Sequence, residues 1–509
     1  MVKNKYTCSL AATGHEAVSE AAAEMLRAGG NAFDAVVAAG FAGAIAEQTL
    51  TSLGGGGFLL ARTADNAEVF FDFFVDTPGL GLDPGQIEPH FFPVGVNFGG
   101  SIQEFNIGLG SVAVPGTLKG LLHVHRRLGR MPLQEVLEPA IELCMGHELN
   151  AFQAGFIRML YPIMTLTEKG RCLYEPAGEY LGRGDELAIP ELADFLRQLA
   201  EDRGKSFYEG DIALAIDQEM REGGGLLTLQ DLQSFKVIER KPLRADYRGY
   251  TLLTGPPPAL GGSLIALSLA LLEKLPQPDK WGTPEHALQT LGMMQEVENL
   301  REMGVSTPEA LAKFIDGKNI GKSIENIRQF SRGTTHVSIA DSEGNIASMT
   351  CSNGEGSGYF APGTGIMLNN MMGEDDLHPD GFHSAPAGQR VGSMMSPSAL
   401  LKDNEVKLVF GSGGSKRIRP ALTQVLTQLV DFKRDLQTAV DAPRLHWDGE
   451  IMQIEPGFAD ETVAAIADRV PVNVWDDQNV YFGGVHSVIP GKKGTGDPRR
   501  GGSTVMVEL

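Results

Sequence analysis

The chain has 509 residues and is acidic, with 64 Asp and Glu against 43 Lys and Arg and a formal net charge of −21 at pH 7. This charge argues against nucleic acid or an anionic membrane as a partner, because both favour a positively charged surface. Hydrophobic residues make up 42% and charged residues 21%, which is ordinary for a soluble globular protein. The length allows several domains or one large α/β unit.

Cysteine usage and hydropathy favour a cytoplasmic protein without a membrane anchor. The first seven residues lead into no sustained apolar segment, so no secretory signal is expected. The most apolar window, residues 259–272, is too short to span a bilayer. The four cysteines form no CxxC pair, so they predict neither a zinc ribbon nor a redox motif but free thiols in a reducing compartment: Cys8, Cys144, Cys172 and Cys351.

Near the N-terminus the pattern predicts two helices followed by two strands. The first helix, 16–28, ends at Gly29-Gly30, and Asn31 can cap the second. The glycine run 54–57 then leads into a strand. A phosphate cradle would need a following Lys-Ser/Thr and βαβ spacing, so a tight turn with close backbone approach explains the run better. Alternation predicts the next strand over 68–74.

The middle of the chain is predicted to be mostly helical. The expected elements are helices at 117–128, 133–143, 190–201 and 211–220, a helix capped by Thr228, and a strand at 250–254. His123 and His125 are two residues apart and face different sides of a helix, so they cannot easily share a metal ion. We therefore expect no metal site there. Residues 305–333 are polar and contain glycine, which is typical of a linker.

The most informative stretch follows this linker. Two alternating runs, 337–340 and 346–350, flank a glycine-containing turn, which predicts a β-hairpin. Gly333 and two threonines precede it. A threonine hydroxyl is a poor nucleophile without an adjacent base, and the α-amine of Thr334 becomes available only if the chain is cut immediately before it. From the residues alone, Thr334 and Thr335 are more simply the start of a strand.

The C-terminal part alternates strands and helices. Strands are expected at 399–401, at 406–410, and near Val480 and Val505, with a helix over 419–432. The glycine-rich loop at 411–415 lacks the GxxxxGK[ST] spacing of a nucleotide site. Strands in both halves with helices between them predict a layered α+β domain.

Several motifs together resemble one known family. The stretch 333–341, Gly-Thr-Thr-His-Val-Ser-Ile-Ala-Asp, is similar to the self-cleavage site of the gamma-glutamyltranspeptidases, which are N-terminal-nucleophile (Ntn) hydrolases. Other blocks that resemble the family follow in the same order, at 29–37, 54–58, 110–116, 207–210, 395–397, 411–414, 442–446 and 497–502. The resemblance implies a four-layer αββα sandwich.

The resemblance also implies roles for individual residues. Cleavage between Gly333 and Thr334 would give a large subunit, 1–333, and a small subunit, 334–509, which together form one compact αββα unit. Thr334 would attack its own preceding peptide and then the substrate, with its freed α-amine as general base. Ser352 takes the place of a family threonine that supports the nucleophile. Gly413 and Gly414 match the pair whose N–H groups form the oxyanion hole. Neither a metal ion nor an organic cofactor is implied.

The substrate pocket departs from the family pattern. Phe74 stands where the family has Arg, Met371 where it has Gln or Glu, and Ser393-Met394 where it has Ser-Ser. Without the charge-assisted bonds of an Arg, the pocket is expected to suit an apolar or differently charged acyl group better than free γ-glutamyl.

Candidates for a substrate α-amine remain in this pocket. They are Asn353 and the acidic run 374–376, which includes Asp375 and Asp376. The spacing around both departs slightly from the family, and it leaves open which residue would bind the amine.

Three functions follow, in order of preference. The first is a self-processing Ntn amidohydrolase or acyltransferase that acts on a small amide or peptide. The second is an unprocessed, inactive scaffold or binding protein of the same fold. The intact set of Thr334, Ser352, Gly413 and Gly414 argues against the second. A nucleotide-binding enzyme is third, because neither glycine-rich stretch has the required spacing.

Overall fold

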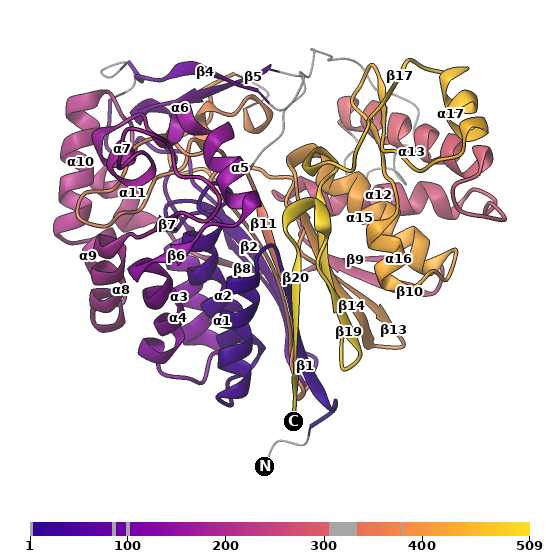
Figure 1. The fold of residues 1–509 in the computed structure, drawn as a ribbon, viewed down its shortest axis with the longest axis horizontal. Helices are drawn as coiled ribbons and strands as arrows, with labels where there is room; N and C mark the ends of the chain where they lie inside the picture. The colour runs from indigo at the N-terminus through magenta and orange to yellow at the C-terminus, as the bar shows by residue number, and fades with distance from the viewer. Residues whose placement is uncertain (1–3, 84–87, 98–101, 305–332, 379–380) are drawn as a thin grey trace.

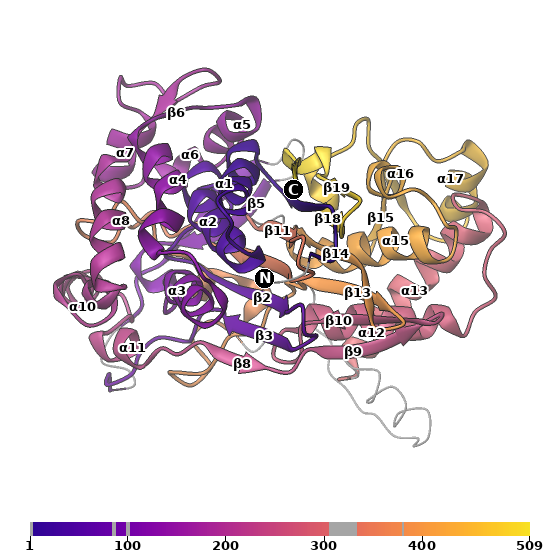
Figure 2. The same ribbon diagram turned by 90° about the horizontal axis from the view of Figure 1, so that it is seen from below.

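Two β-sheets lie face to face in the middle of the protein, and helices cover the outer face of each (Figure 1). The view from below shows the same order of helices, sheet, sheet and helices (Figure 2). This computed structural model describes residues 4–83, 88–97, 102–304, 333–378 and 381–509. It confirms the α+β class and the αββα layers that the family resemblance implied.

The first sheet contains the predicted hairpin. In the described part of the chain it has seven antiparallel strands, in the order β20 (Ser503–Glu508), β1 (Cys8–Thr13), β11 (Thr335–Ala340), β12 (Ile346–Ser352), β2 (Gly56–Arg62), β3 (Glu68–Phe73) and β8 (Ile238–Arg240). β11 and β12 form the hairpin, with Val337 opposite Met349. Its turn is closed by Asp341, whose Oδ1 accepts the N–H groups of Gly344 and Asn345.

The second sheet packs against the first through β14 and β18, which contact β11. Counting described residues only, it has six strands, in the order β19 (Lys493–Thr495), β18 (Gly484–Ile489), β14 (Glu405–Gly413), β13 (Ser398–Lys402), β10 (Tyr250–Thr254) and β9 (Leu243–Tyr247). The strands predicted at 250–254, 399–401 and 406–410 are confirmed as β10, β13 and β14.

Helices α1 (Glu16–Arg27), α2 (Ala32–Ala46) and α3 (Thr117–Leu128) pack on the first sheet, and α4 (Leu133–Met145) packs on α2. Apart from Asp34 in its first turn, α2 is apolar on all sides, and every one of its residues is buried because the sheet and the other helices enclose it. Asn31 caps it as predicted, accepting the N–H groups of Phe33 and Asp34.

The second sheet is covered by α12 (Leu260–Glu273), α15 (Ile418–Val430) and α16 (Leu436–Asp441), with α13 (Pro284–Glu302) packed on α12. Apolar side chains of α12 and α15 join those of β10, β13 and β14 in one core. α15 confirms the helix predicted over 419–432.

The remaining elements lie around these four layers. The helices are α5 (Ala151–Met159), α6 (Tyr161–Met164), α7 (Glu168–Tyr174), α8 (Pro190–Asp202), α9 (Lys205–Tyr208), α10 (Asp211–Gly223), α11 (Leu229–Ser234) and α17 (Asp460–Ala467). The strands are β4 (Phe92–Asn97), β5 (Ile102–Ile107), β6 (His147–Glu148), β7 (Glu186–Leu187), β15 (Leu445–Trp447), β16 (Met452–Ile454) and β17 (Val472–Val474). Thr228 caps α11 as predicted, with Asp231 completing the capping box.

Glycines let the central strands approach their neighbours closely. In the run 54–57, a Cβ on Gly55 would lie 2.2 Å from the carbonyl oxygen of Ser352. On β14, a Cβ on Gly411 would lie 2.2 Å from Cε1 of His336. No side chain fits at such distances. Close packing of the glycine backbone against neighbouring strands and the His336 ring therefore explains both glycine-rich stretches, and neither supports nucleotide binding.

Two expectations need comment. The strand predicted near Val480 is wrong: residues 480–482 form a 3-10 helix, η5 (Val480–Phe482), and the strand begins at Gly484. The apolar residues suggested a strand, but Asn479 accepts the N–H of Tyr481 and caps a helical turn instead. The predicted linker lies outside the described residues except for Gly333.

Candidate active site

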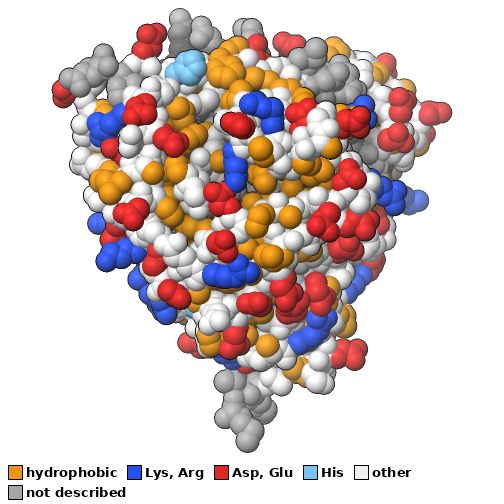
Figure 3. Space-filling view, turned by 60° about the vertical axis from the view of Figure 1, so that its left-hand side comes forward, with side chains coloured by type: hydrophobic (Ala, Val, Ile, Leu, Met, Phe, Trp, Pro, Cys, Tyr) orange, Lys and Arg blue, Asp and Glu red, His pale blue; other side chains and the backbone are white. Residues whose placement is uncertain are grey.

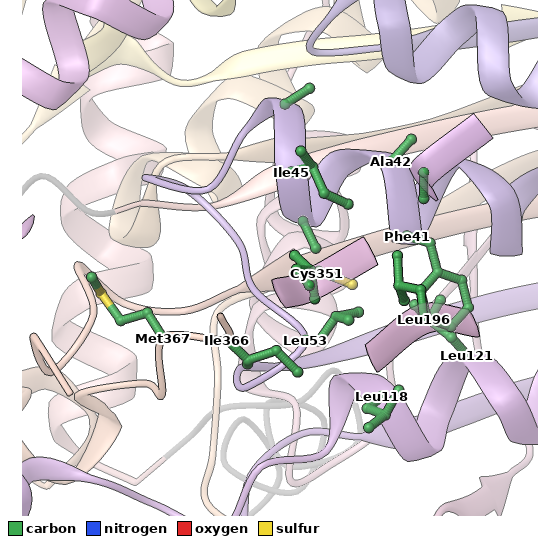
Figure 4. Packing of buried hydrophobic residues seen from close by; sticks show 14 of the residues in the cluster. Phe41, Ala42, Ile45, Leu53, Leu118, Leu121, Leu196, Cys351, Ile366 and Met367 are labelled. Atoms are coloured by element: carbon green, nitrogen blue, oxygen red, sulfur yellow. The ribbon is translucent and has the colours of Figure 1, made fainter. Parts of the chain in front are cut away.

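Thr334 lies immediately before β11, in the centre of the first sheet, and is 3% exposed. Thr335 pairs with Cys351, and His336 with Thr350. Strand alternation therefore places Cys351 on the helical side of the sheet and Thr350 on the side of the second sheet. Figure 4 shows Cys351 among buried apolar side chains that include Ile45 of α2 and Leu53.

Two polar side chains contact Gly333. The Ser352 hydroxyl donates a hydrogen bond to the Gly333 carbonyl oxygen at 2.5 Å and accepts the N–H of Gly354 at 3.1 Å. The N–H of Gly333 donates to Oε1 of Glu355 at 3.2 Å. The carbonyl that Thr334 would have to attack is therefore hydrogen-bonded by Ser352.

Arg500 and the end of β14 lie on the other side of Thr334. Nη1 of Arg500 donates to the Thr334 carbonyl oxygen at 3.1 Å. Burial and the neighbouring Arg417 lower the pKa of Arg500 to about 9, so it remains a cation at neutral pH. A Cβ on Gly413 would lie 2.1 Å from the same carbonyl oxygen. Gly414 has φ +121°, a conformation that favours glycine.

A buried carboxyl group lies beside the next residue. The Thr335 hydroxyl donates to Oε1 of Glu47 at 2.8 Å, whereas Oε2 is buried and has no hydrogen-bond partner among the described residues. Burial raises the pKa of Glu47 to about 7, and the Thr335 hydrogen bond and Arg500 only partly oppose this. A cavity of about 10 Å³, which Cys351 also lines, adjoins the carboxyl group.

Between the two sheets, His336 forms part of a buried polar chain. Its Nδ1 is 2.7 Å from the Thr350 hydroxyl and its Nε2 is 2.9 Å from the Ser338 hydroxyl. Ser338 in turn donates to the carbonyl oxygen of His486. Burial lowers the pKa of His336 well below its usual range, so the ring is neutral and holds the strand in place.

Asn353, a predicted substrate ligand, follows Ser352 directly. It is 1% exposed, and neither Oδ1 nor Nδ2 of its side chain has a hydrogen-bond partner among the described residues. Buried amides are nearly always hydrogen-bonded, so this group is suited to bind a polar group of a ligand. The neighbouring turn is held by Asn370, whose Oδ1 accepts the N–H of Glu355 at 3.0 Å.

The structure brings together two of the three apolar replacements. Phe74 and Met371 are buried in the same core cluster, where the Phe74 ring stacks on Phe58 at 5.4 Å. Met394 belongs to a different cluster, packed on α12 and α13. Together with Ser393 it lines a cavity of about 270 Å³.

The acidic run divides between the inside and the outside of the protein. Glu374 is buried, and a Cβ on Gly354 would lie 2.3 Å from its Oε1. Asp375 is exposed, in the turn η3 (Asp375–Leu377). Asp376 belongs to the same turn, and its side chain lies outside the described part of the structure. The acidic residue that points toward Asn353 and its loop is therefore Glu374.

Three charged residues of this site were missed or left without a role by the sequence reasoning: Glu47, Glu355 and Arg500. Arg500 stands in one of the family-like blocks, and Glu355 stands between two glycines close after Ser352. Glu47 is the C-cap of α2, a helix that is apolar after Asp34 in its first turn. A charge in such a position is a usable signal, because burying it requires a partner.

The described residues contain no group of three or more His, Cys, Asp or Glu side chains arranged to hold a metal ion. His123 binds Glu239 and His125 binds the Met131 carbonyl oxygen, each separately. No helix in the described ranges has the length and apolar character needed to cross a membrane. On the face drawn in Figure 3, acidic side chains are interspersed with Lys and Arg.

Comparison with known proteins gives agreeing results. The family model described as gamma-glutamyltranspeptidase matches residues 18–507. The Acylase ACY 1 proenzyme of Pseudomonas sp. (strain V22) is 31% identical over 486 residues, which are 90% of this chain and 86% of the relative. The glutathione hydrolase proenzyme of Escherichia coli (strain K12) is 30% identical over 478 residues, 86% of this chain and 81% of the relative. Among solved structures, a cephalosporin acylase from Bacillus halodurans matches with a TM-score of 0.83 and 24% identity over 98% of this chain and 96% of that one, which supports the fold.

Proposed function

Since the chain belongs to the gamma-glutamyltranspeptidase family of amide-bond hydrolases and acyltransferases, we propose that Thr334 is its nucleophile and that the protein frees Thr334 by cutting itself. The Ser352 hydroxyl, bonded to the Gly333 carbonyl oxygen at 2.5 Å, is the observation that carries this proposal. It directs a hydrogen-bond donor at the oxygen on which negative charge develops during attack.

Self-cleavage proceeds through an ester. The Thr334 hydroxyl oxygen bonds to the Gly333 carbonyl carbon, the peptide C–N bond breaks, and the hydroxyl proton passes to the departing nitrogen. Water then hydrolyses the ester and leaves a large subunit, 1–333, and a small subunit, 334–509, whose first residue is Thr334. The new α-amine and the hydroxyl now belong to the same residue.

The processed protein then uses the same hydroxyl on substrate amides. The α-amine of Thr334 takes the hydroxyl proton as general base and transfers it to the leaving amine. As the family resemblance implies, the N–H groups of Gly413 and Gly414 stabilise the oxyanion, together with the Ser352 hydroxyl that already binds the Gly333 carbonyl oxygen. Arg500 holds the Thr334 carbonyl oxygen beside Gly413. Water or a second amine accepts the acyl group, so both hydrolysis and transfer are possible outcomes.

The acyl group is proposed to be apolar or to be charged differently from γ-glutamyl. Phe74 and Met371 fill their positions with buried apolar atoms, which offer a carboxylate no hydrogen bond. Polar recognition is left to Asn353, with its unpaired buried amide, and to the acidic run, in which Glu374 points inward and Asp375 outward. Asp376 and Ser393 remain candidates for polar contacts with the substrate. The substrate is a small amide or peptide, and the lone cysteines favour a reducing location such as the cytoplasm.

The intact mass of the purified protein tests the proposal. Wild type is expected to give two pieces, the smaller starting at Thr334, whereas Thr334→Ala is expected to remain one uncut chain because it lacks the hydroxyl. Thr504→Ala is the matched control, since Thr504 is an exposed threonine on β20 of the same sheet, and it should be cut like wild type. A single uncut wild-type chain would overturn the proposal and favour the inactive scaffold of the same fold.

A further inference from the structure

The uncut chain has a glycine on the acyl side of the proposed cleavage site. We propose that the processed enzyme prefers glycyl-type acyl donors, in which an unbranched CH₂ next to the scissile carbonyl carries a nitrogen, and that Glu355 binds this nitrogen. The inference rests on the proposed function, because it treats the Gly333–Thr334 bond as the first substrate of Thr334.

The position of Gly333 indicates where a substrate acyl group must lie. Both reactions pass through an ester on the same Thr334 oxygen, so the acyl carbon bonded to that oxygen occupies nearly the same place in each ester. The atoms attached to the Gly333 carbonyl carbon therefore mark the start of the acyl pocket. The carbonyl oxygen meets Ser352, the next atom is the Gly333 Cα, and the atom after that is its nitrogen.

The pocket has no room for a branch at the first carbon. A Cβ added to Gly333 would lie 2.4 Å from the carbonyl oxygen of Gly354, 2.7 Å from that of Thr49 and 3.2 Å from Cα of Leu50. All three are backbone atoms, which cannot turn away as a flexible side chain would. An acyl group with an L-configured substituent on this carbon is therefore excluded.

The next atom meets a fixed acceptor. The Gly333 N–H donates to Oε1 of Glu355, a buried carboxylate whose own N–H is held by Asn370. The turn is further fixed by the Gly356 N–H, which donates to the carbonyl oxygen of Asn353 at 3.1 Å. After cleavage Gly333 ends the large subunit, and a substrate can occupy this place only once Gly333 has left it and its hydrogen bond to Glu355 is broken. A substrate with a nitrogen at the same position restores it, and a charged α-ammonium would make it stronger.

This chemistry separates glycyl from γ-glutamyl donors. Both have an unbranched CH₂ beside the carbonyl, so both fit against the backbone atoms that would clash with a Cβ on Gly333. The following atom of γ-glutamyl is a carbon, which offers no hydrogen bond to Glu355. Hydrogen bonds to charged groups typically change rates or affinities on the order of ten- to a hundredfold, and we expect a preference of this size.

The test compares four p-nitroanilides on the processed wild type: glycyl, propionyl, L-alanyl and γ-glutamyl. Propionyl matches glycyl in shape with a methyl group in place of the nitrogen. In each reaction Thr334 forms an ester with the acyl group, the aniline leaves with the hydroxyl proton, and water releases the free acid. The kcat/KM for glycyl is expected to exceed that for propionyl on the order of ten- to a hundredfold, and L-alanyl is expected to be the poorest.

Glu355→Gln supplies the second measurement, because Gln removes the charge but keeps nearly the same shape. It is expected to lower kcat/KM for glycyl toward the propionyl value and to leave propionyl unchanged. Glu405→Gln, at an exposed position on β14, is the control. If Glu355→Gln fails to process itself, the comparison of the four substrates on wild type still tests whether the enzyme prefers glycyl donors.

The outcomes separate the two proposals. A wild-type chain that never cuts itself overturns the proposed function. A chain that is cut, yet hydrolyses propionyl as fast as glycyl or L-alanyl as fast as either, overturns only the inference about Glu355 and the acyl group. A cut chain that hydrolyses none of the four also overturns it.

Discussion

Charged side chains are buried on both sides of the proposed nucleophile. Arg500 bonds the Thr334 carbonyl oxygen from the side of the second sheet, and Glu47 bonds the Thr335 hydroxyl from the side of α2. Each lowers the cost of burying the other, because opposite charges in a medium of low dielectric attract. Burial still dominates for Glu47, whose pKa rises to about 7.

This raised pKa makes folding stability depend on pH. In the unfolded chain Glu47 releases its proton near pH 4.5, and in the folded protein near pH 7. Its contribution is therefore complete below pH 4.5 and is lost as the pH rises through 7. Glu47→Gln cannot ionise, so this decline, at most about 3 kcal/mol, is expected to disappear. Denaturant unfolding of the uncut Thr334→Ala chain at pH 4.5 and pH 8, with and without Glu47→Gln, measures it.

An exposed glutamate provides the control for this experiment. Glu450→Gln, in the same Thr334→Ala background, should leave the difference between the two pH values unchanged. If Glu47→Gln also leaves that difference unchanged, then Glu47 ionises in the folded protein as it does in the unfolded one.

At the scale of elements, two glycines of β14 allow the second sheet to pack closely against the first. Gly411 and Gly413 alternate along it, so both face the first sheet, one against the His336 ring and one against the Thr334 carbonyl oxygen. The two hydrogen bonds of His336 prevent its ring from moving aside. At His336 and Thr334 the two sheets therefore approach closely because β14 has no side chain at 411 and 413.

Gly411→Ala should push the sheets apart. Its Cβ would lie 2.2 Å from His336 Cε1, so we expect a destabilisation of about 1–3 kcal/mol and slower self-cleavage at Thr334, two residues from His336. Thermal unfolding and the fraction of cut chain over time measure the two effects. Gly292→Ala, on an exposed part of α13 with no atom within 4 Å of the new Cβ, should be neutral or slightly stabilising. Equal behaviour of both variants would contradict the packing argument.

Local sequence signals predicted the elements around Thr334, the proposed nucleophile. The hairpin, the Asn31 cap and the close-packing role of the 54–57 glycine run all depend on residues near one another in sequence. The position of Glu355 could not be predicted in this way, because its turn is fixed by Asn370, 15 residues later. The separation of Met394 from Phe74 and Met371 likewise depends on how α12 and α13 pack.

At the scale of the whole molecule, the two proposed subunits share both sheets. In the first sheet, β11 and β12 of the small subunit lie between β1 and β2 of the large one, and β20 pairs with the outer edge of β1. In the second sheet, β13 of the small subunit pairs with β10 of the large one. Neither subunit contains all the strands of either of these two sheets.

We therefore expect the subunits to stay together after cleavage. Size-exclusion chromatography without denaturant should give one peak, with both subunits in equal amounts and the elution volume of uncut Thr334→Ala. In denaturant the subunits should separate, because only non-covalent contacts join them. Release of residues 334–509 as a separate peak under native conditions would contradict this arrangement.

Under the proposed function, the bond between Arg500 and Thr334 also affects when the protein becomes active during its synthesis. The two residues are 166 positions apart, so a ribosome that has just added Thr334 must add 166 more before Arg500 exists. At about 5–20 residues per second, this takes on the order of ten seconds or more. A nascent chain that stops early therefore lacks the contact that holds Thr334 beside Gly413. Under the proposed function, incomplete products of translation would remain uncut and inactive, and self-cleavage would begin only after residue 500 has been added.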